Sequence, residues 1–148
     1  MRESIGNSFI FYFVIIFFAL FILFFVGALS YTKAFKVKNR IVDIIENNDG
    51  LINNAVESEI DKNLGEMGYR IDPRANCKNQ RFENDSSYKK VEKTTGSSYR
   101  YCIYEKTIKD KGKYYAVVAY MYFEVPLIGA NLEFPVFGET KVFTKIKY

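Results

Sequence analysis

The chain divides into three consecutive patterns of hydrophobic and polar positions, and the first contains no charged side chain. It runs from Phe9 to Leu29 and reads FIFYFVIIFFALFILFFVGAL. At about 1.5 Å per residue, a helix of this length spans roughly 30 Å, the thickness of the hydrocarbon core of a bilayer. A surface helix of a soluble protein keeps a polar face, which this stretch lacks. The pattern therefore predicts a transmembrane helix.

Two other interpretations fit part of this stretch. A cleaved secretory signal has a shorter apolar core, of about 7–15 residues, behind a positively charged start. Here Arg2 is offset by Glu3, although Ala28-Leu29-Ser30 resembles a small-x-small cleavage site. A helix buried in a soluble domain is the other alternative, and it would require this segment to fold in water. We favour a membrane helix that is retained.

The second pattern is helical and amphipathic, and it follows the apolar stretch without a break. No Pro or Gly occurs between Ala28 and Asp49, so we expect one continuous helix from about Ser4 to Asn47. Its outer part carries one apolar stripe: Ala34, Val37, Ile41, Val42, Ile44 and Ile45. Charged residues occupy the remaining surface: Lys33, Lys36, Lys38, Arg40, Asp43 and Glu46. Another element has to cover the apolar stripe.

A second, short amphipathic helix is predicted after the turn sequence Asn47-Asn48-Asp49-Gly50. Its apolar residues recur at helical spacing: Ile52, Ala55, Val56, Ile60, Leu64 and Met67. Gly68 is well placed to end it. A polar, irregular loop is expected from Tyr69 to Ser98, with a short edge strand from Tyr88 to Val91.

The third pattern has a period of two and is rich in Tyr and β-branched residues, so it predicts strands. The first strand runs from Tyr99 to Thr107. A turn at Asp110-Lys-Gly112 leads to a central strand from Tyr114 to Val125, which is apolar on both faces. The last strand, from Phe134 to Ile146, alternates apolar even positions with charged odd positions, as in a sheet with one wet face.

These elements predict an α+β fold. A long N-terminal transmembrane helix continues as an amphipathic helix, and a second short helix and a three- to four-stranded antiparallel sheet follow. Residues 1–8 would be a short leader or cytoplasmic tail, residues 9–29 the transmembrane helix, and residues 30–148 an extracytoplasmic domain. The lysines directly after the apolar stretch favour a cytoplasmic C-terminus, but long domains translocate largely regardless of flanking charge. A pair of cysteines and a Tyr-rich sheet suit an external domain, so we place the domain outside the cytoplasm.

The chain contains two cysteines, Cys77 and Cys102, and no histidine. A structural zinc site needs four Cys or His ligands, and a Cys-x-x-Cys pair is absent, so we expect no metal site and no redox motif. An even pair suggests a disulfide if the domain faces an oxidising compartment, and two unpaired buried thiols are the alternative. A Cys77–Cys102 bond would stabilise the domain by roughly 3 kcal/mol in the chain-entropy model.

The charged residues indicate no catalytic site. Without His, the commonest general base and the usual partner of a Ser or Cys nucleophile are missing. Carboxylates remain at Glu105, Asp110, Glu124 and Glu139, but their spacing singles out no catalytic pair. The net charge of +4 is mild, and basic and acidic residues are interleaved, unlike the basic patch of a nucleic-acid binder. We expect no enzyme, no cofactor and no nucleic-acid partner.

Three segments resemble type IV pilin-like subunits, and more narrowly the TadE-like proteins of tight-adherence pilus systems. They are Arg2-Glu-Ser-Ile-Gly6 before Phe9, the stretch from Tyr31 to Asn39, and the end of the chain from Val125-Pro-Leu-Ile-Gly129 to Gly138-Glu-Thr140. The resemblance implies a pilin-like fold and leader processing between Gly6 and Asn7. It also implies other pilin-like or pilus-assembly proteins as partners of the N-terminal helix, in addition to membrane lipid. The Glu that this family carries at the fifth position after the leader is replaced here by Phe11.

Two functions from different classes follow. The first is a non-enzymatic, single-pass, pilin-like (TadE-like) subunit or assembly factor of a pilus or secretion system. The alternative is a membrane-anchored extracytoplasmic module that binds an envelope component or ligand through a Tyr-rich sheet, with its tyrosines at Tyr114, Tyr115, Tyr120 and Tyr122. For these tyrosines we favour core and cross-strand packing.

Overall fold

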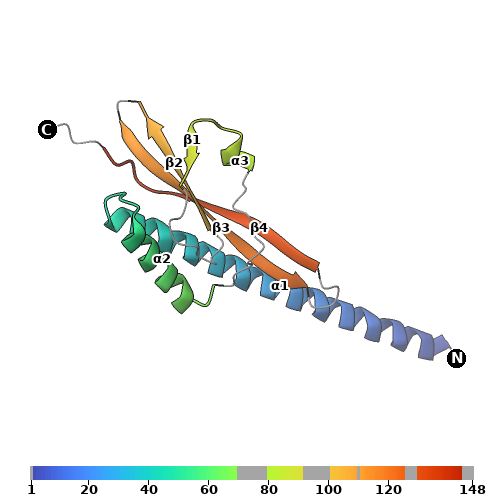
Figure 1. Ribbon diagram of the computed structural model, residues 1–148. Coiled ribbons are helices and arrows are strands. Elements are labelled where there is room, and N and C mark those ends of the chain that lie inside the picture. The colour runs from blue at the N-terminus through green and yellow to red at the C-terminus, as the bar shows by residue number, and fades with distance from the viewer. Residues whose placement is uncertain (1, 70–79, 92–100, 110, 126–129, 145–148) are drawn as a thin grey trace.

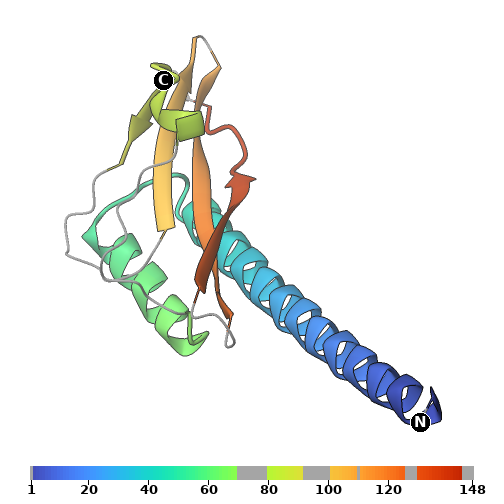
Figure 2. The same ribbon diagram turned by 90° about the vertical axis from the view of Figure 1, so that its right-hand side faces the viewer.

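A single helix of 46 residues dominates the molecule. The computed structural model describes residues 2–69, 80–91, 101–109, 111–125 and 130–144. Helix α1 extends from Arg2 to Asn47, and its N-terminal half projects away from the other elements (Figures 1 and 2). The prediction of one continuous helix through the apolar stretch and the amphipathic stretch is confirmed.

Helix α1 ends in a cap that the turn sequence supplies. Asp49 adopts a φ of 51°, and the Gly50 N–H donates to the Ile45 carbonyl over 2.9 Å. A left-handed residue followed by this backward hydrogen bond is the Schellman arrangement. The Gly50 carbonyl then accepts a hydrogen bond of 2.8 Å from the Tyr115 hydroxyl, which ties the end of the helix to the sheet.

Helix α2 runs from Asn54 to Glu66. The side chain of Asn53 caps its start by accepting a hydrogen bond from the Val56 N–H. At its other end Gly68 takes a φ of 59°, which confirms the predicted stop. The chain turns there, and the Tyr69 N–H donates to the Leu64 carbonyl over 3.2 Å.

The four strands form one antiparallel sheet in the order β1-β2-β3-β4. They are β1 (Tyr88–Lys90), β2 (Tyr101–Ile108), β3 (Gly112–Val125) and β4 (Ala130–Glu139). The predicted edge strand and the predicted central strand are therefore confirmed as β1 and β3. The expected turn at Asp110 lies partly outside the described residues.

The last strand differs from its prediction at both ends, because β4 begins at Ala130 and ends at Glu139. Beyond it, Thr140 still pairs with Tyr115, but the next bridge joins Lys113 to Phe143. One extra residue on the outer strand is a β-bulge, and a bulge reverses which side chains face the core. Phe143 consequently packs against the core while Val142 is exposed, the opposite of the predicted alternation.

The two faces of the sheet are covered differently. Helices α1 and α2 lie on one face and bury the main core there (Figure 1). Its fully buried members include Val37, Ile41 and Ile45 from α1, Ile60 from α2, and Val117 from β3. The predicted apolar stripe of α1 is thus covered by the sheet and by α2.

The centre of the opposite face is also covered, in agreement with the prediction that the central strand is apolar on both faces, whereas the last strand had indicated a solvent-exposed face. A short helix, α3 (Gln80–Glu83), lies within the stretch predicted to be an irregular loop. Its Phe82 is 3% exposed and stacks on Tyr104 with ring centroids 5.1 Å apart. Tyr88 and Phe137 complete the aromatic cluster, at 4.9 and 5.7 Å from the Phe82 ring. These aromatic contacts give the sheet a second, smaller core.

Lys38 was predicted to lie on the charged surface of α1, and the structure buries it. Only 9% of the residue is exposed. Its stem lies across Gly138 of β4, where any side chain would overlap it, and its ammonium sits 4.1 Å from the centre of the Phe35 ring. A long apolar stem with a cation above an aromatic ring makes this burial tolerable.

Candidate functional site

The most conspicuous surface of the molecule is the apolar half of α1. Except for the half-buried Leu23, its large hydrophobic side chains between Phe9 and Leu29 are exposed, from 37% for Val26 to 76% for Phe24. By length and composition the helix is apolar enough to cross a membrane, and none of its most apolar window is buried inside the molecule. In the part of the chain that the structure describes, no residue from Phe9 to Leu29 is buried, so α1 is a possible membrane anchor.

Burial begins abruptly after Leu29 on the same helix. Leu29 is 56% exposed, whereas Ala34 is 1% exposed and Val37 is fully buried. Lys33 is the first charged residue after the apolar stretch. The rings of Tyr31 and Phe35 stack outside the core, with centroids 6.4 Å apart. Exposed aromatic rings and lysines at the end of an apolar helix are typical of the boundary between lipid and water.

A groove opens at this boundary, where α2 ends beside α1. It has a volume of about 460 Å³ and is lined by Leu29, Thr32, Lys33 and Lys36 from α1 and by Met67 after α2. One turn further along α1, the same helix face is closed, because the Arg40 guanidinium donates two hydrogen bonds of 2.9 and 2.8 Å to the Asn63 side chain. The groove therefore lies where α2 ends and no longer covers this face of α1.

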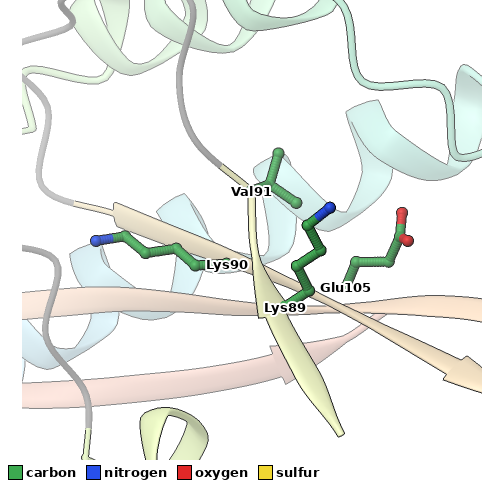
Figure 3. Close-up of a pocket in the computed structure, with 4 residues that line it drawn as sticks. All are labelled: Lys89, Lys90, Val91 and Glu105. Atoms are coloured by element: carbon green, nitrogen blue, oxygen red, sulfur yellow. The ribbon is translucent and has the colours of Figure 1, made fainter. Parts of the chain in front are cut away.

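A second hollow lies at the edge of the sheet, on β1 and β2. Its volume is about 550 Å³, and its lining is Lys89, Lys90, Val91 and Glu105. Lys89 and Glu105 point to the same side, whereas Lys90 extends in another direction (Figure 3). Glu105 is already held by Lys113, with 3.2 Å between nitrogen and oxygen. The hollow thus contains paired and solvated charges, without a convergent set of catalytic groups.

Most of the tyrosines are used inside the fold. Tyr101, Tyr104, Tyr115 and Tyr120 are at most 7% exposed. Tyr69 reaches across to β3, where its hydroxyl donates to the Tyr120 carbonyl over 2.8 Å and accepts from the Tyr120 N–H over 2.9 Å. The side chain of Tyr122 lies outside the described residues. The described tyrosines therefore support packing rather than an open stacking surface.

Tyr114 is half-buried beside the aromatic cluster. Its hydroxyl forms a hydrogen bond of 2.8 Å with the hydroxyl of Tyr88. Lost hydration and then this hydrogen bond raise the pKa of Tyr114 well above its ordinary value. A tyrosine of this kind is a poor proton donor or acceptor near neutral pH, so the pair stabilises the sheet and offers no acid–base chemistry.

The structure describes one end of the predicted disulfide. Cys102 is buried on β2, with its Sγ 3.9 Å from the Tyr120 hydroxyl, and the described residues include no free thiol. Cys77 lies outside the described residues, so the Cys77–Cys102 bond stays a prediction. Gly6 and Asn7 lie in the first turns of α1, and processing between them also stays a prediction.

The acidic residues do not converge on a site. Among the described residues, no group of three or more Cys, Asp or Glu side chains is close enough to hold a metal ion. Of the carboxylates considered from the sequence, Asp110 and the side chain of Glu124 lie outside the described residues. Asp85 caps the turn before β1: hydrogen bonds from Ser87, and secondarily the charge of Lys106, lower the pKa of its carboxyl group.

Comparison with known proteins gives no relative: no family model matches the chain, and no curated protein or solved structure matches it.

Proposed function

We propose that the chain is a non-enzymatic, single-pass membrane protein, a pilin-like (TadE-like) subunit or assembly factor of a pilus or secretion system. In this proposal the apolar half of α1 lies in the membrane, with its other half and the sheet outside the cytoplasm. The N-terminal helix packs laterally against the helices of other pilin-like or pilus-assembly proteins.

The proposal rests mainly on one observation: a single unbroken helix has an exposed apolar half and a half that packs in the core of the α+β unit. From Phe9 to Leu29 its side chains are exposed and apolar, and from Ala34 onward the same helix forms the core of the α+β unit. An exposed apolar surface of this length cannot remain in water, since it would aggregate. Lipid and neighbouring helices are the two surroundings that satisfy it, and a pilin-like subunit uses both in turn.

Two experiments test the proposal. Mass spectrometry of the protein extracted from membranes measures its N-terminus, and a start at Asn7 would support leader processing after Gly6. Deletion of the gene followed by electron microscopy and a secretion assay tests the assembly role. Normal pili and normal secretion in the deletion strain would contradict that role, whatever the state of the N-terminus.

The alternative, a ligand-binding module built on the Tyr-rich sheet, has less support. Its proposed tyrosines include Tyr115 and Tyr120, which are 2% and 7% exposed. Tyr114 is half-buried and already bonded to Tyr88. A ligand could reach these rings only if the sheet opened, so no observation in the described part of the chain favours this function over the first.

A further inference from the structure

We propose that the groove lined by Leu29, Thr32, Lys33, Lys36 and Met67 binds the headgroup of an anionic phospholipid. The inference rests on the proposed membrane anchor and adds to it a specific ligand. Four of the five lining residues come from one face of α1, at steps of three and four residues, and the fifth comes from the end of α2.

The two lysines of the groove are available for a ligand. Among the residues that the structure describes, neither Lys33 nor Lys36 forms an ion pair or a hydrogen bond, and the groove lining contains no acidic side chain. The Lys33 ammonium lies beside the end of α2, 3.7 Å from the position that a Cβ on Gly68 would take. Arg40, the next cation on this face, is instead bound to Asn63. The groove thus has two unpaired positive charges.

The position of the groove on α1 matches the level of lipid headgroups. If Leu29 marks the end of the hydrocarbon core, Lys33 and Lys36 lie roughly 6 and 10 Å further along the helix axis. The polar layer on each side of a bilayer is about 5–7 Å thick, so the backbone of Lys33 lies in that layer and that of Lys36 about 3 Å beyond it. Side chains of a helix incline toward its N-terminus, so the long Lys36 side chain can reach back to the layer. A lysine near an anionic membrane surface attracts the lipid charge.

The apolar part of the lining favours a lipid over free phosphate. Leu29 and Met67 form apolar walls next to the two cations, and Leu29 is 56% exposed. A phosphate ion would gain nothing from these walls. A phospholipid places its phosphate at the lysines and the upper part of its acyl chains against the apolar walls.

The test uses the full chain in nanodiscs of phosphatidylcholine that contain a minor share of phosphatidylglycerol. Native mass spectrometry counts the lipids that stay bound after the disc is removed. We expect the wild-type chain to retain phosphatidylglycerol in preference to phosphatidylcholine. In the double variant K33Q/K36Q this preference should fall by roughly tenfold or more, because two charges near the surface are removed.

The matched control is K109Q/K111Q, which removes the same charge from the β2–β3 turn, at the end of the sheet remote from the projecting half of α1 (Figure 1). The control should keep the wild-type preference for phosphatidylglycerol. The variant K33R/K36R, which keeps both positive charges at the groove, should keep it as well. An equal loss in both Gln variants would overturn the site, since it would reflect total charge alone. Displacement of the lipid by inorganic phosphate would overturn the choice of a lipid as the ligand.

Two failures are distinguishable in this experiment. A chain that does not insert into the discs would overturn the proposed membrane anchor and this inference together. A chain that inserts but retains both lipids equally would overturn only the inference.

Discussion

Gly112 begins β3 in a backbone conformation that other residues rarely adopt, with a φ of 121°. A second reason for glycine at this position is the close approach of the Phe143 backbone. The Lys113 N–H donates to the Phe143 carbonyl over 3.1 Å, and the Phe143 N–H donates back over 2.7 Å. A Cβ on Gly112 would overlap that carbonyl oxygen, which is backbone and cannot rotate away.

We therefore expect Gly112→Ala to lower the free energy of unfolding by about 2–4 kcal/mol, through strain and overlap together. Urea denaturation in detergent, followed by circular dichroism, measures the change. Gly27→Ala is the matched control: a Cβ at Gly27 would have no atom within 4 Å, so we expect no loss of stability and a gain of at most about 1 kcal/mol from higher helix propensity. Equal effects of the two substitutions would contradict the role of the Phe143 contact.

The raised pKa of Tyr114 predicts a loss of stability at alkaline pH. Because the folded state holds this proton more tightly than the unfolded state, the stabilisation is complete below the unfolded pKa of about 10. It is lost as the pH rises from there through the folded pKa. The pKa values of Lys113 and Tyr115 are also raised, so they act in the same direction.

We expect the free energy of unfolding to fall as the pH rises above about 10, and the fall to be shallower in Tyr114→Phe. Denaturation at a series of pH values measures both slopes. Tyr31→Phe is the control, because Tyr31 is 53% exposed. If Tyr114→Phe keeps the wild-type slope, the half-buried hydroxyl pair of Tyr114 and Tyr88 does not contribute to the loss of stability at high pH.

The sequence predicts residue environments well only where one element decides them. Gly68 was identified as a helix stop because the helix and its cap are local. Lys38 and Phe143 were assigned to the wrong environment, since each depends on a distant partner. Lys38 of α1 is buried because Gly138 of β4 leaves space for its side chain, and Phe143 turns inward because a bulge shifts the register.

At the scale of elements, α1 combines an exposed apolar helix and an amphipathic core helix in one continuous element. Ile41 of its outer half is fully buried against the sheet, whereas Ile16 of its apolar half is 59% exposed. The same substitution in the two halves should therefore have different effects on the stability of the α+β unit.

We expect Ile41→Ala to lower the free energy of unfolding by about 2–5 kcal/mol, the usual cost of a cavity in a core. Ile16→Ala should change it by less than about 0.5 kcal/mol, because this side chain packs on nothing in the described chain. Denaturation in the same detergent measures both variants. A large effect of Ile16→Ala would mean that the apolar half also packs against the α+β unit.

Helix α3 shows which elements sequence patterns miss. It has four residues, too few to establish a helical period, and it lies within a polar stretch. Its contribution to the second core comes from one side chain, Phe82, which contacts three other aromatic rings. A single Phe in a polar loop carries no periodic signal, although its isolation among polar residues is a hint that it is buried.

At the scale of the whole molecule, the proposed membrane location depends on the apolar half of α1. Phe18, near the middle of this stretch, is 59% exposed. We expect the triple variant Phe17→Lys, Phe18→Lys and Phe21→Lys to release much of the protein from the membrane fraction, because each lysine near the centre of a membrane helix costs about 2.5–3.5 kcal/mol and three together offset the summed contribution of the apolar side chains. Alkaline carbonate extraction of cell membranes, followed by immunoblotting, measures the bound fraction.

Leu51→Lys is the matched control for this experiment. Leu51 is 65% exposed and follows α1 at the end opposite to the apolar half. The same change of an exposed apolar residue to lysine should leave the protein in the membrane fraction. If both variants stay in the membrane after carbonate extraction, α1 is not the anchor.

The sequence predicts the apolar surface of the molecule but not its groove. A long uncharged run is visible in one dimension, so the stretch from Phe9 to Leu29 could be identified without a structure. The groove depends on how α2 runs beside α1 and on where α2 ends, at Glu66, which places Met67 beside Leu29 at the end of the apolar stretch. No local pattern in either helix contains that information.

Helix α1 contains no proline and no break between Arg2 and Asn47, so its two halves move together as one rigid element. The C-terminal half of α1 packs against the sheet. A tilt or axial rotation of the apolar half would therefore change the orientation of the strands as well. If the apolar half of α1 lies in a bilayer, as we propose, the angle between the sheet and the membrane follows from the helices that pack against α1 and from its interfacial Tyr and Lys side chains. A proline inserted near Leu29 would uncouple this orientation while leaving both halves intact.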